Sequence, residues 1–174
     1  EPIDVTSSPA ISGSSCSPIP TGRTDLLFGV IGRSTGELFV HGGSGTLLKC
    51  SGDLCTPLTT QTIALLNKVW ISQSGEVWAA ASNGDVLKCG ANTCALLSAG
   101  TGLSLDGIAG DGAGQVWAVG TAGTLVRCAG EKCLSISSGA VTNLGSISGT
   151  ASGEVWAGGQ GLIRCTGGSC TTIT

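Results

Sequence analysis

Short apolar runs alternate with turn-forming residues along most of the chain. Within residues 103–141, four such runs of four to six residues are separated by Gly, Ser, Thr and Asn. The runs span 104–109, 115–119, 124–128 and 133–136. Runs of this length between turn residues are typical of antiparallel strands. No window of ten or more residues shows the 3.6-residue period of a helix, so the pattern predicts an all-β fold.

The same pattern recurs with a period of 39 residues. Each unit places an aromatic residue after a Gly-Glu/Gln-Val/Leu step, at Phe39, Trp78, Trp117 and Trp156. A period near 40 with four strands per unit is typical of a β-propeller blade. We therefore predict a propeller domain over 25–174. Its four-stranded antiparallel blades would cover about 25–63, 64–102, 103–141 and 142–174.

Composition narrows the possible functions. The 174 residues include 30 Gly, and 41% are hydrophobic against 11% charged, a balance that argues against disorder. The net charge is −3 and the chain has no basic run, so we expect no nucleic-acid partner. No apolar stretch approaches the roughly 18–20 residues that cross a bilayer, and we expect no membrane span. A start at Glu1 without a leader favours a processed secreted protein or a piece of a longer one.

Eight of the nine cysteines form Cys-x4-Cys pairs, one in each unit. The pairs are Cys50/Cys55, Cys89/Cys94, Cys128/Cys133 and Cys165/Cys170. Zinc needs four ligands around one ion, whereas these pairs fall on separate blades, and the single histidine, His41, lies at no zinc-finger spacing. We expect no metal and no cofactor. A disulfide across a two-residue hairpin turn is predicted in every blade, and with it a secreted, periplasmic or cell-surface location.

Cys16 is the remaining cysteine. It lies 39 residues before Cys55, and Ile11 stands where its partner in the repeat would be. Residues 1–24 are therefore interpreted as an N-terminal extension that contains a degenerate partial repeat. Cys16 is predicted to be unpaired within this chain, either as a free thiol or bonded to another chain.

The repeated aromatic residue has two interpretations, namely packing between blades and a ring of sugar-stacking platforms. Its identical placement beside Val and Ala favours packing. Trp70 differs because its equivalents are Ile31, Ala109 and Ser148, so it does not belong to the repeat. We predict Trp70 as the ligand-binding residue, with core filling in one blade as the alternative.

Charged residues also repeat. Lys49, Lys88, Arg127 and Arg164 precede the first cysteine of each pair, and Glu37, Glu76, Gln115 and Glu154 precede the aromatic residue. We interpret the basic residues as solvated edge charges with these Glu and Gln residues as cross-strand partners. Asp111 is the single carboxylate of its loop. A turn is therefore favoured there over a calcium site, since calcium takes six to eight oxygens.

One string carries a family resemblance. Gly-x-Val-Trp-Ala-x-Gly-x-x-Gly-Thr-Leu, at 114–125 and in altered form at 75–86 and 153–162, resembles the blade repeat of bacterial extracytoplasmic propellers. These include sensor propellers of two-component regulators, photosystem-assembly-factor-like propellers and secreted antibiotic-lyase-like propellers. The resemblance covers about 25–174 and implies a propeller fold. It carries over no catalytic residue, because the lyase-like enzymes depend on histidine and His41 lies in no matching motif.

These observations favour a non-catalytic, extracytoplasmic binding or scaffold module that acts through propeller loops on a protein or glycan ligand. A carbohydrate-binding lectin is the alternative. An enzyme ranks last because the candidate acids lie singly in different units, at Asp25, Asp53, Asp85, Asp106, Asp111 and Glu131.

The number of blades in the complete ring is left open by the sequence. Four units with a partial repeat before them fit a closed four-bladed ring, a fragment of a larger propeller, or a homo-oligomer that completes a larger ring. The incomplete first repeat favours the last two.

Overall fold

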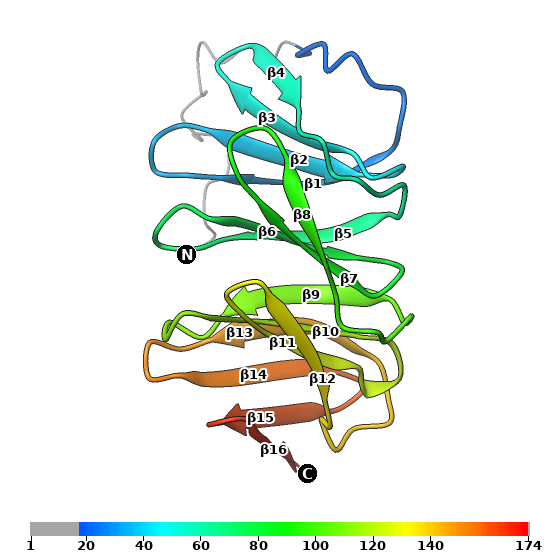
Figure 1. Ribbon diagram of the computed structural model, residues 1–174, viewed down its shortest axis with the longest axis vertical. Coiled ribbons are helices and arrows are strands. Elements are labelled where there is room, and N and C mark those ends of the chain that lie inside the picture. Colours follow the sequence, from blue (N-terminus) through cyan, green and yellow to red (C-terminus); the bar gives the residue numbers. More distant parts are fainter. Residues whose placement is uncertain (1–17, 174) are drawn as a thin grey trace, which may run out of the picture.

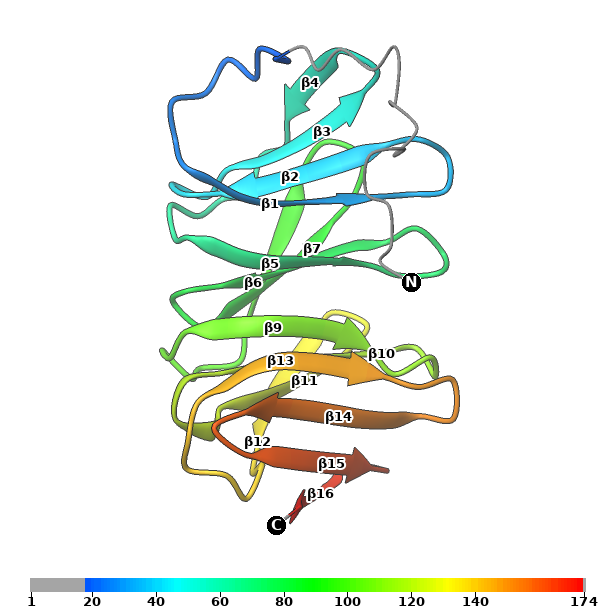
Figure 2. The ribbon, with the colours of Figure 1, turned by 180° about the vertical axis from the view of Figure 1, so that it is seen from behind.

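The computed structural model describes residues 18–173 and contains four separate sheets of four antiparallel strands (Figures 1 and 2). The strands follow one another in chain order within each sheet, so every connection inside a blade is a hairpin. The blades are β1 (Leu27–Gly32), β2 (Leu38–Gly42), β3 (Leu47–Ser51) and β4 (Leu54–Pro57); β5 (Leu66–Ile71), β6 (Val77–Ala81), β7 (Asp85–Cys89) and β8 (Cys94–Ser98); β9 (Leu105–Gly110), β10 (Gln115–Gly120), β11 (Leu125–Ala129) and β12 (Lys132–Ile136); and β13 (Leu144–Gly149), β14 (Glu154–Gly159), β15 (Leu162–Thr166) and β16 (Ser169–Ile173). A 3-10 turn, η2 (Thr121–Gly123), joins β10 to β11. The predicted all-β propeller of four blades is confirmed.

Each blade has two chemically different faces, because side chains alternate across a strand. The face that bears Phe39, Trp78, Trp117 or Trp156 is called here the aromatic face. The opposite face bears the cysteine pair and is called the disulfide face. In the second blade, for example, Trp78 pairs with Lys88 on one face, while the neighbouring pair of Val77 and Cys89 lies on the other.

The aromatic face of each blade packs on the disulfide face of the next. Phe39 of the first blade joins Val77 and Leu87 of the second in one buried cluster. Trp78 packs in the same way against the third blade, and Trp117 against the fourth. Phe39, Trp78 and Trp117 are each 2% exposed. The packing interpretation of the repeated aromatic residue is therefore confirmed for the three blades that have a following neighbour.

All four predicted disulfides are present: Cys50–Cys55, Cys89–Cys94, Cys128–Cys133 and Cys165–Cys170. In each blade the two cysteines are directly opposite on the third and fourth strands, with Cα atoms 3.8 to 4.1 Å apart. Two-residue turns close these hairpins, and Gly52, Gly130 and Gly167 supply the positive φ that such turns need. The bonds therefore hold the register of the outermost hairpin of every blade.

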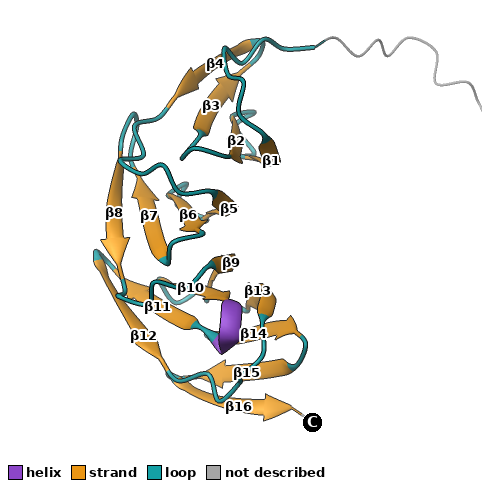
Figure 3. Ribbon diagram, turned by 90° about the vertical axis from the view of Figure 1, so that its right-hand side faces the viewer, coloured by secondary structure: helices purple, strands orange, loops and turns teal. Residues whose placement is uncertain are grey.

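The four blades form an open arc (Figure 3). The first strands of the blades lie along its inner side, and the fourth strands lie along its outer side. The first blade and the fourth blade are at opposite ends of the arc and do not meet. Between residues 18 and 173 the blades alone therefore do not close a four-bladed ring.

Candidate functional site

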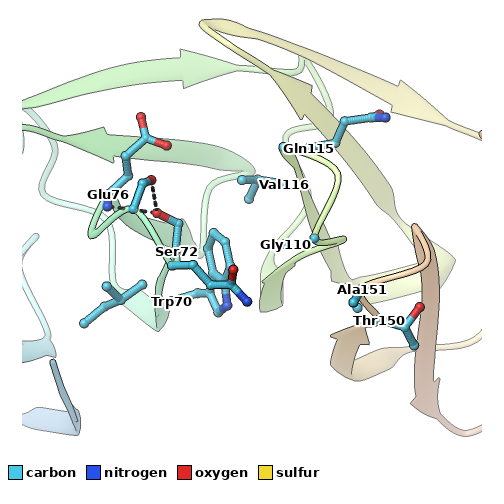
Figure 4. Close-up of a pocket in the computed structure, with 14 residues that line it drawn as sticks. Trp70, Ser72, Glu76, Gly110, Gln115, Val116, Thr150 and Ala151 are labelled. Carbon is cyan, nitrogen blue, oxygen red and sulfur yellow. Dashed lines mark hydrogen bonds between the residues drawn. The ribbon is translucent and has the colours of Figure 1, made fainter. Parts of the chain in front are cut away.

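A cavity of about 450 Å³ opens where the second, third and fourth blades converge. The loops between the first and second strands of these blades form its walls. Figure 4 shows the segment from Trp70 to Glu76 on one side and Gly110, Gln115 and Thr150 on the other. The cavity therefore draws on residues from three different repeats.

Trp70 forms the aromatic wall of this cavity. It lies on the aromatic face of β5, opposite Trp78 on β6, and is half-buried. Its indole rests on the backbone of β9, because a Cβ on Gly110 would overlap the ring. The glycine thus makes the space that the tryptophan fills, and the rest of the ring borders the cavity. The structure supports both interpretations of Trp70, since it packs between two blades and also lines an open space.

Glycines line much of the rest of the cavity. Gly112, Gly114 and Gly149 contribute backbone in place of side chains. Gly149 has no room for a side chain, since a Cβ there would overlap the carbonyl oxygen of Gly110. The third and fourth blades therefore approach closely at this point, and their glycines present main-chain atoms to the cavity.

The rim of the cavity is polar. Ser72 accepts a hydrogen bond from the Glu76 backbone N–H at 2.9 Å, and its Oγ lies 2.8 Å from the Oγ of Ser74. Glu76 forms an ion pair with Lys88 at 2.9 Å. Gln115 and Thr150 border the opposite side. An aromatic wall with a small number of hydroxyl, amide and carboxylate groups around it is the usual composition of a ligand site.

One loop position differs in every blade, and in the first and third blades its side chain contacts the repeated aromatic residue. It is Arg33, Ser72, Asp111 and Thr150 in the four blades. Asp111, buried in the third blade, accepts hydrogen bonds from Trp117 Nε1 at 3.1 Å and from the backbone N–H groups of Ala113 and Gln115 at 2.9 and 3.0 Å. All three bonds hold the loop in place, so Asp111 has the predicted turn role.

Trp78 in the second blade lacks this arrangement. Its Nε1 is buried and has no hydrogen-bond partner among residues 18–173. Ser72 stands where the third blade has Asp111, and its hydroxyl is used by the loop backbone at Glu76. An indole N–H left without an acceptor in an apolar interface costs about 1–3 kcal/mol.

In the first blade the same loop position holds a cation. The guanidinium of Arg33 lies 4.9 Å from the centre of the Phe39 ring and forms an ion pair with Glu37 at 2.7 Å. It also donates to the carbonyl oxygen of Gly75 in the second blade. Lys49 contacts Glu37 at 2.6 Å, and Lys49 and Arg33 together hold the pKa of the Glu37 carboxyl below its usual range. Arg33 therefore connects two blades, a role that the repeat pattern does not reveal.

The repeated basic residues make the predicted cross-strand partners but are not on the outer edge. Ion pairs join Lys49 to Glu37, Lys88 to Glu76, and Arg164 to Glu154. The interpretation as edge charges is wrong, because these residues lie on the third strand of each blade, with the fourth strand beyond. In the last three blades they cover the tryptophan ring, with Lys88, Arg127 and Arg164 at 5.2 to 5.7 Å from the ring centre.

His41 is buried between the first and second blades. Its Nδ1 lies 2.8 Å from the carbonyl oxygen of Leu66, so this nitrogen carries the proton and donates. Burial lowers the pKa of His41, and the bond to Leu66 partly opposes that effect. The ring packs directly on β1, since a Cβ on Gly29 would lie 2.6 Å from its Nε2. The histidine thus serves the contact between blades and lies outside the cavity.

The remaining predictions concern metal sites, membrane spans and Cys16. Within the described part of the chain, His, Cys, Asp and Glu side chains nowhere gather in threes that could bind a metal ion. No helix in that part has the length and the apolar character needed to cross a membrane. Cys16 lies outside the described residues.

Comparisons with known proteins identify the fold and no family. No family model and no curated protein matches the sequence. A solved structure of U3-55K aligns with 87% of this chain and 53% of its own, at 11% identity and a TM-score of 0.71. "YCF48 bound to D1 peptide" aligns with 89% of this chain and 55% of its own, at 18% identity and a TM-score of 0.63.

A sensor protein is also among the similar structures. The extracellular domain of the putative hybrid two component system BT4673 from B. thetaiotaomicron aligns with 88% of this chain at 13% identity and a TM-score of 0.63. This chain spans only 25% of that domain, and about half of the other two proteins. The predicted resemblance to the blades of sensor and photosystem-assembly propellers is confirmed at the level of the scaffold.

Proposed function

We propose that this chain is a non-catalytic, extracytoplasmic module that binds a short extended segment of another protein in the cavity beside Trp70. The observation that carries the proposal is the half-buried indole of Trp70, held against Gly110, at the wall of a cavity of about 450 Å³. Tryptophan is among the residues that contribute most to binding when they lie in a partly desolvated pocket.

The lining of the cavity favours a peptide as the ligand. Glycines from the third and fourth blades line the cavity with main-chain atoms in place of side chains, next to the side chains of Gln115 and Thr150. These groups suit the main chain of an extended peptide, and the indole suits an apolar side chain of that peptide. The similar structure of YCF48 is described as bound to D1 peptide, which supports this use of the scaffold.

A non-catalytic role is supported by the polar groups themselves. His41 is buried between blades, with Nδ1 occupied by the Leu66 carbonyl. The carboxylate of Asp111 is occupied by three N–H donors that hold its loop. Glu76 is the acidic residue at the cavity, and it is paired with Lys88. A general acid or base needs a free group beside the substrate, and these three groups already have structural partners.

An extracytoplasmic location is supported by the disulfides. Four bonds, one in each blade, depend on an oxidising compartment, since thiol pairs stay reduced in most cytosols. The extracellular domain of BT4673, which has a similar fold, is consistent with this location.

A library of random linear peptides, selected on the oxidised protein, tests the proposal. We expect selected peptides to quench tryptophan fluorescence and to lose about 30-fold in affinity on Trp70→Ala, because a buried tryptophan anchor contributes about 2 kcal/mol. Ile63→Ala is the matched control, since Ile63 is 89% exposed and lies outside the cavity. Selected peptides that bind Trp70→Ala and the native protein equally would refute the site.

A lectin is the second candidate. A tryptophan ring beside a rim of hydroxyl, amide and carboxylate groups also suits a sugar, which stacks one face on an aromatic ring and donates through its hydroxyls. A glycan array distinguishes the two functions. Binding of a glycan that is lost on Trp70→Ala and retained on Ile63→Ala would favour the lectin, and a folded protein that gives no signal on the array would exclude it.

A further inference from the structure

The two ends of the arc expose faces that are buried everywhere else in the molecule. Within the chain, three interfaces place the aromatic face of one blade on the disulfide face of the next. The first blade has no preceding blade among residues 18–173, and the fourth has no following one. Among residues 18–173, one disulfide face and one aromatic face therefore have no neighbouring blade, although Leu48 and Cys50 on the disulfide face are buried.

The free disulfide face of the first blade has the same apolar residue types as the buried ones. Val30 is 64% exposed, whereas its equivalents Val69 and Ile108 are 3% and 4% exposed. Leu38 is 40% exposed, whereas Val77, Val116 and Val155 at the same repeat position are 1%, 5% and 1% exposed. The sequence of the first blade thus fits a covered face. Its β1–β2 part, at Val30 and Leu38, is exposed, whereas Leu48 and Cys50 on β3 of the same face are 0% and 2% exposed.

The free aromatic face of the fourth blade is also more exposed than its equivalents inside the molecule. Trp156 is half-buried, whereas the three aromatic residues at its repeat position are each 2% exposed. Arg164 covers its ring at 5.5 Å and pairs with Glu154, as Lys88 and Glu76 do inside the molecule. The face is therefore built like the aromatic faces that do have a neighbour.

These two faces are complementary in kind, and they lie at opposite ends of an open arc (Figure 3). The chain also covers only 53% and 55% of two propellers with the same fold, so an arc of this length is about half of such a molecule. We propose that two copies of the chain pair head to tail. The aromatic face of each fourth blade then packs on the disulfide face of the other copy's first blade, and the two arcs close a ring of eight blades.

The proposed pairing continues an interface that the chain already makes three times. Both new contacts have the composition of the internal ones, and a twofold axis relates them. A head-to-tail contact closes into a ring only when the rotation between copies is right, and otherwise it grows into a filament. The solution mass therefore tests both the contact and the closure.

The experiment measures the mass of the oxidised chain by sedimentation equilibrium over a range of concentrations. All proteins carry Cys16→Ser, so that a bond between two Cys16 thiols cannot account for a pair. We expect a single species of about 34 kDa, which is twice the 17.0 kDa of one chain. A monomer at every concentration, or a ladder of higher masses, would overturn the closed pair.

Two variants test which faces meet. Val30→Asp places a charge on the free disulfide face, and Trp156→Asp places one on the free aromatic face. Each variant alone should be a monomer, because both of its contacts contain a damaged face. A mixture of the two should regain the 34 kDa species, since one contact then has two intact faces. A mixture that stays monomeric would contradict the head-to-tail arrangement.

A control variant and the pattern of dissociation distinguish head-to-tail pairing from other modes of pairing. Ile63→Asp charges a residue that is 89% exposed in the connection between the first and second blades, and it should remain a dimer. If Val30→Asp dissociates the dimer and Trp156→Asp does not, two first blades pair face to face and the ring is wrong. Circular dichroism verifies that each variant keeps its strands.

Discussion

The second and third blades bury the same tryptophan in the same place and surround it differently. Trp78 and Trp117 are both 2% exposed, each on the second strand of its blade and each covered by a basic side chain. Trp117 donates to the buried carboxylate of Asp111 at 3.1 Å. The Nε1 of Trp78 finds no acceptor within residues 18–173, because Ser72 replaces the aspartate.

The repeat contains two kinds of position, strand residues and loop residues. The strand residues set where the ring lies, and they are almost the same in both blades. The loop residue decides whether the polar edge of the ring has a partner, and it differs in all four blades. Loop positions 72 and 150 also border the cavity beside Trp70. The repeat thus supplies a scaffold, and the non-repeating loop residues give each blade its own chemistry.

The largest expected effect comes from removing either ring. Trp117→Ala and Trp78→Ala should each lower the free energy of unfolding by about 3–5 kcal/mol, because both leave a large cavity between blades. Trp117→Ala should cost more, since it also takes one of three donors from the buried Asp111. Chemical denaturation of the oxidised proteins measures both values. A larger loss for Trp78→Ala would mean that the carboxylate contact adds nothing.

The loop residue itself should have the next effect. Asp111→Ser gives the third blade the loop residue of the second and removes the acceptor of Trp117 Nε1. We expect a loss of about 1–3 kcal/mol, the cost of leaving a buried polar group without its partner. The matched variant is Thr150→Ser in the fourth blade, which keeps the hydroxyl that accepts from the Glu154 backbone N–H. An equal loss in both variants would show that serine, rather than the missing carboxylate, is responsible.

Replacing each tryptophan by phenylalanine isolates the indole N–H. Trp117→Phe should cost about 1–2 kcal/mol more than Trp78→Phe, because only the first substitution breaks a hydrogen bond, while the second removes an unpaired donor. The difference should vanish when Trp117→Phe is made together with Asp111→Ser, as a double-mutant cycle requires of a direct interaction. A difference that persists in the double variant would assign it to ring packing.

Repetition explains what could be predicted from the sequence. Strand alternation and the Cys-x4-Cys spacing are local, and they recur four times, so the strands of the third blade and the four disulfides followed directly. The packing of Trp70 on Gly110 and the reach of Arg33 to Gly75 join residues about 40 positions apart in neighbouring blades. They depend on how the blades stack, which no single repeat encodes. The basic residues lie on the third strand, one strand inside the outer edge, and the local spacing of charges does not distinguish these two positions.

His41 lies in the first blade, at the repeat position that Ala80 occupies in the second blade. Because burial lowers its pKa in the folded state below the ordinary 6.5, the unfolded chain binds a proton at a higher pH than the folded chain does. Stability should therefore be full above pH 6.5 and should fall as the pH drops through 6.5 towards the lower folded-state pKa. His41→Asn keeps an N–H donor for Leu66 without titrating. The two proteins should diverge over this range, and parallel pH curves would contradict the assignment.

The smallest expected effect concerns the charges over the two rings. Lys88 pairs with Glu76 in the second blade, whereas Arg127 in the third faces Gln115, which carries no charge. Gln115→Glu should therefore raise stability by less than about 1 kcal/mol, and Glu76→Gln should lower it by a similar amount, because exposed ion pairs contribute little. Both differences should shrink in high salt, since screening weakens contacts between solvated charges. Denaturation midpoints at low and high salt measure this, and a salt-independent change would point to altered packing of the glutamine instead of charge.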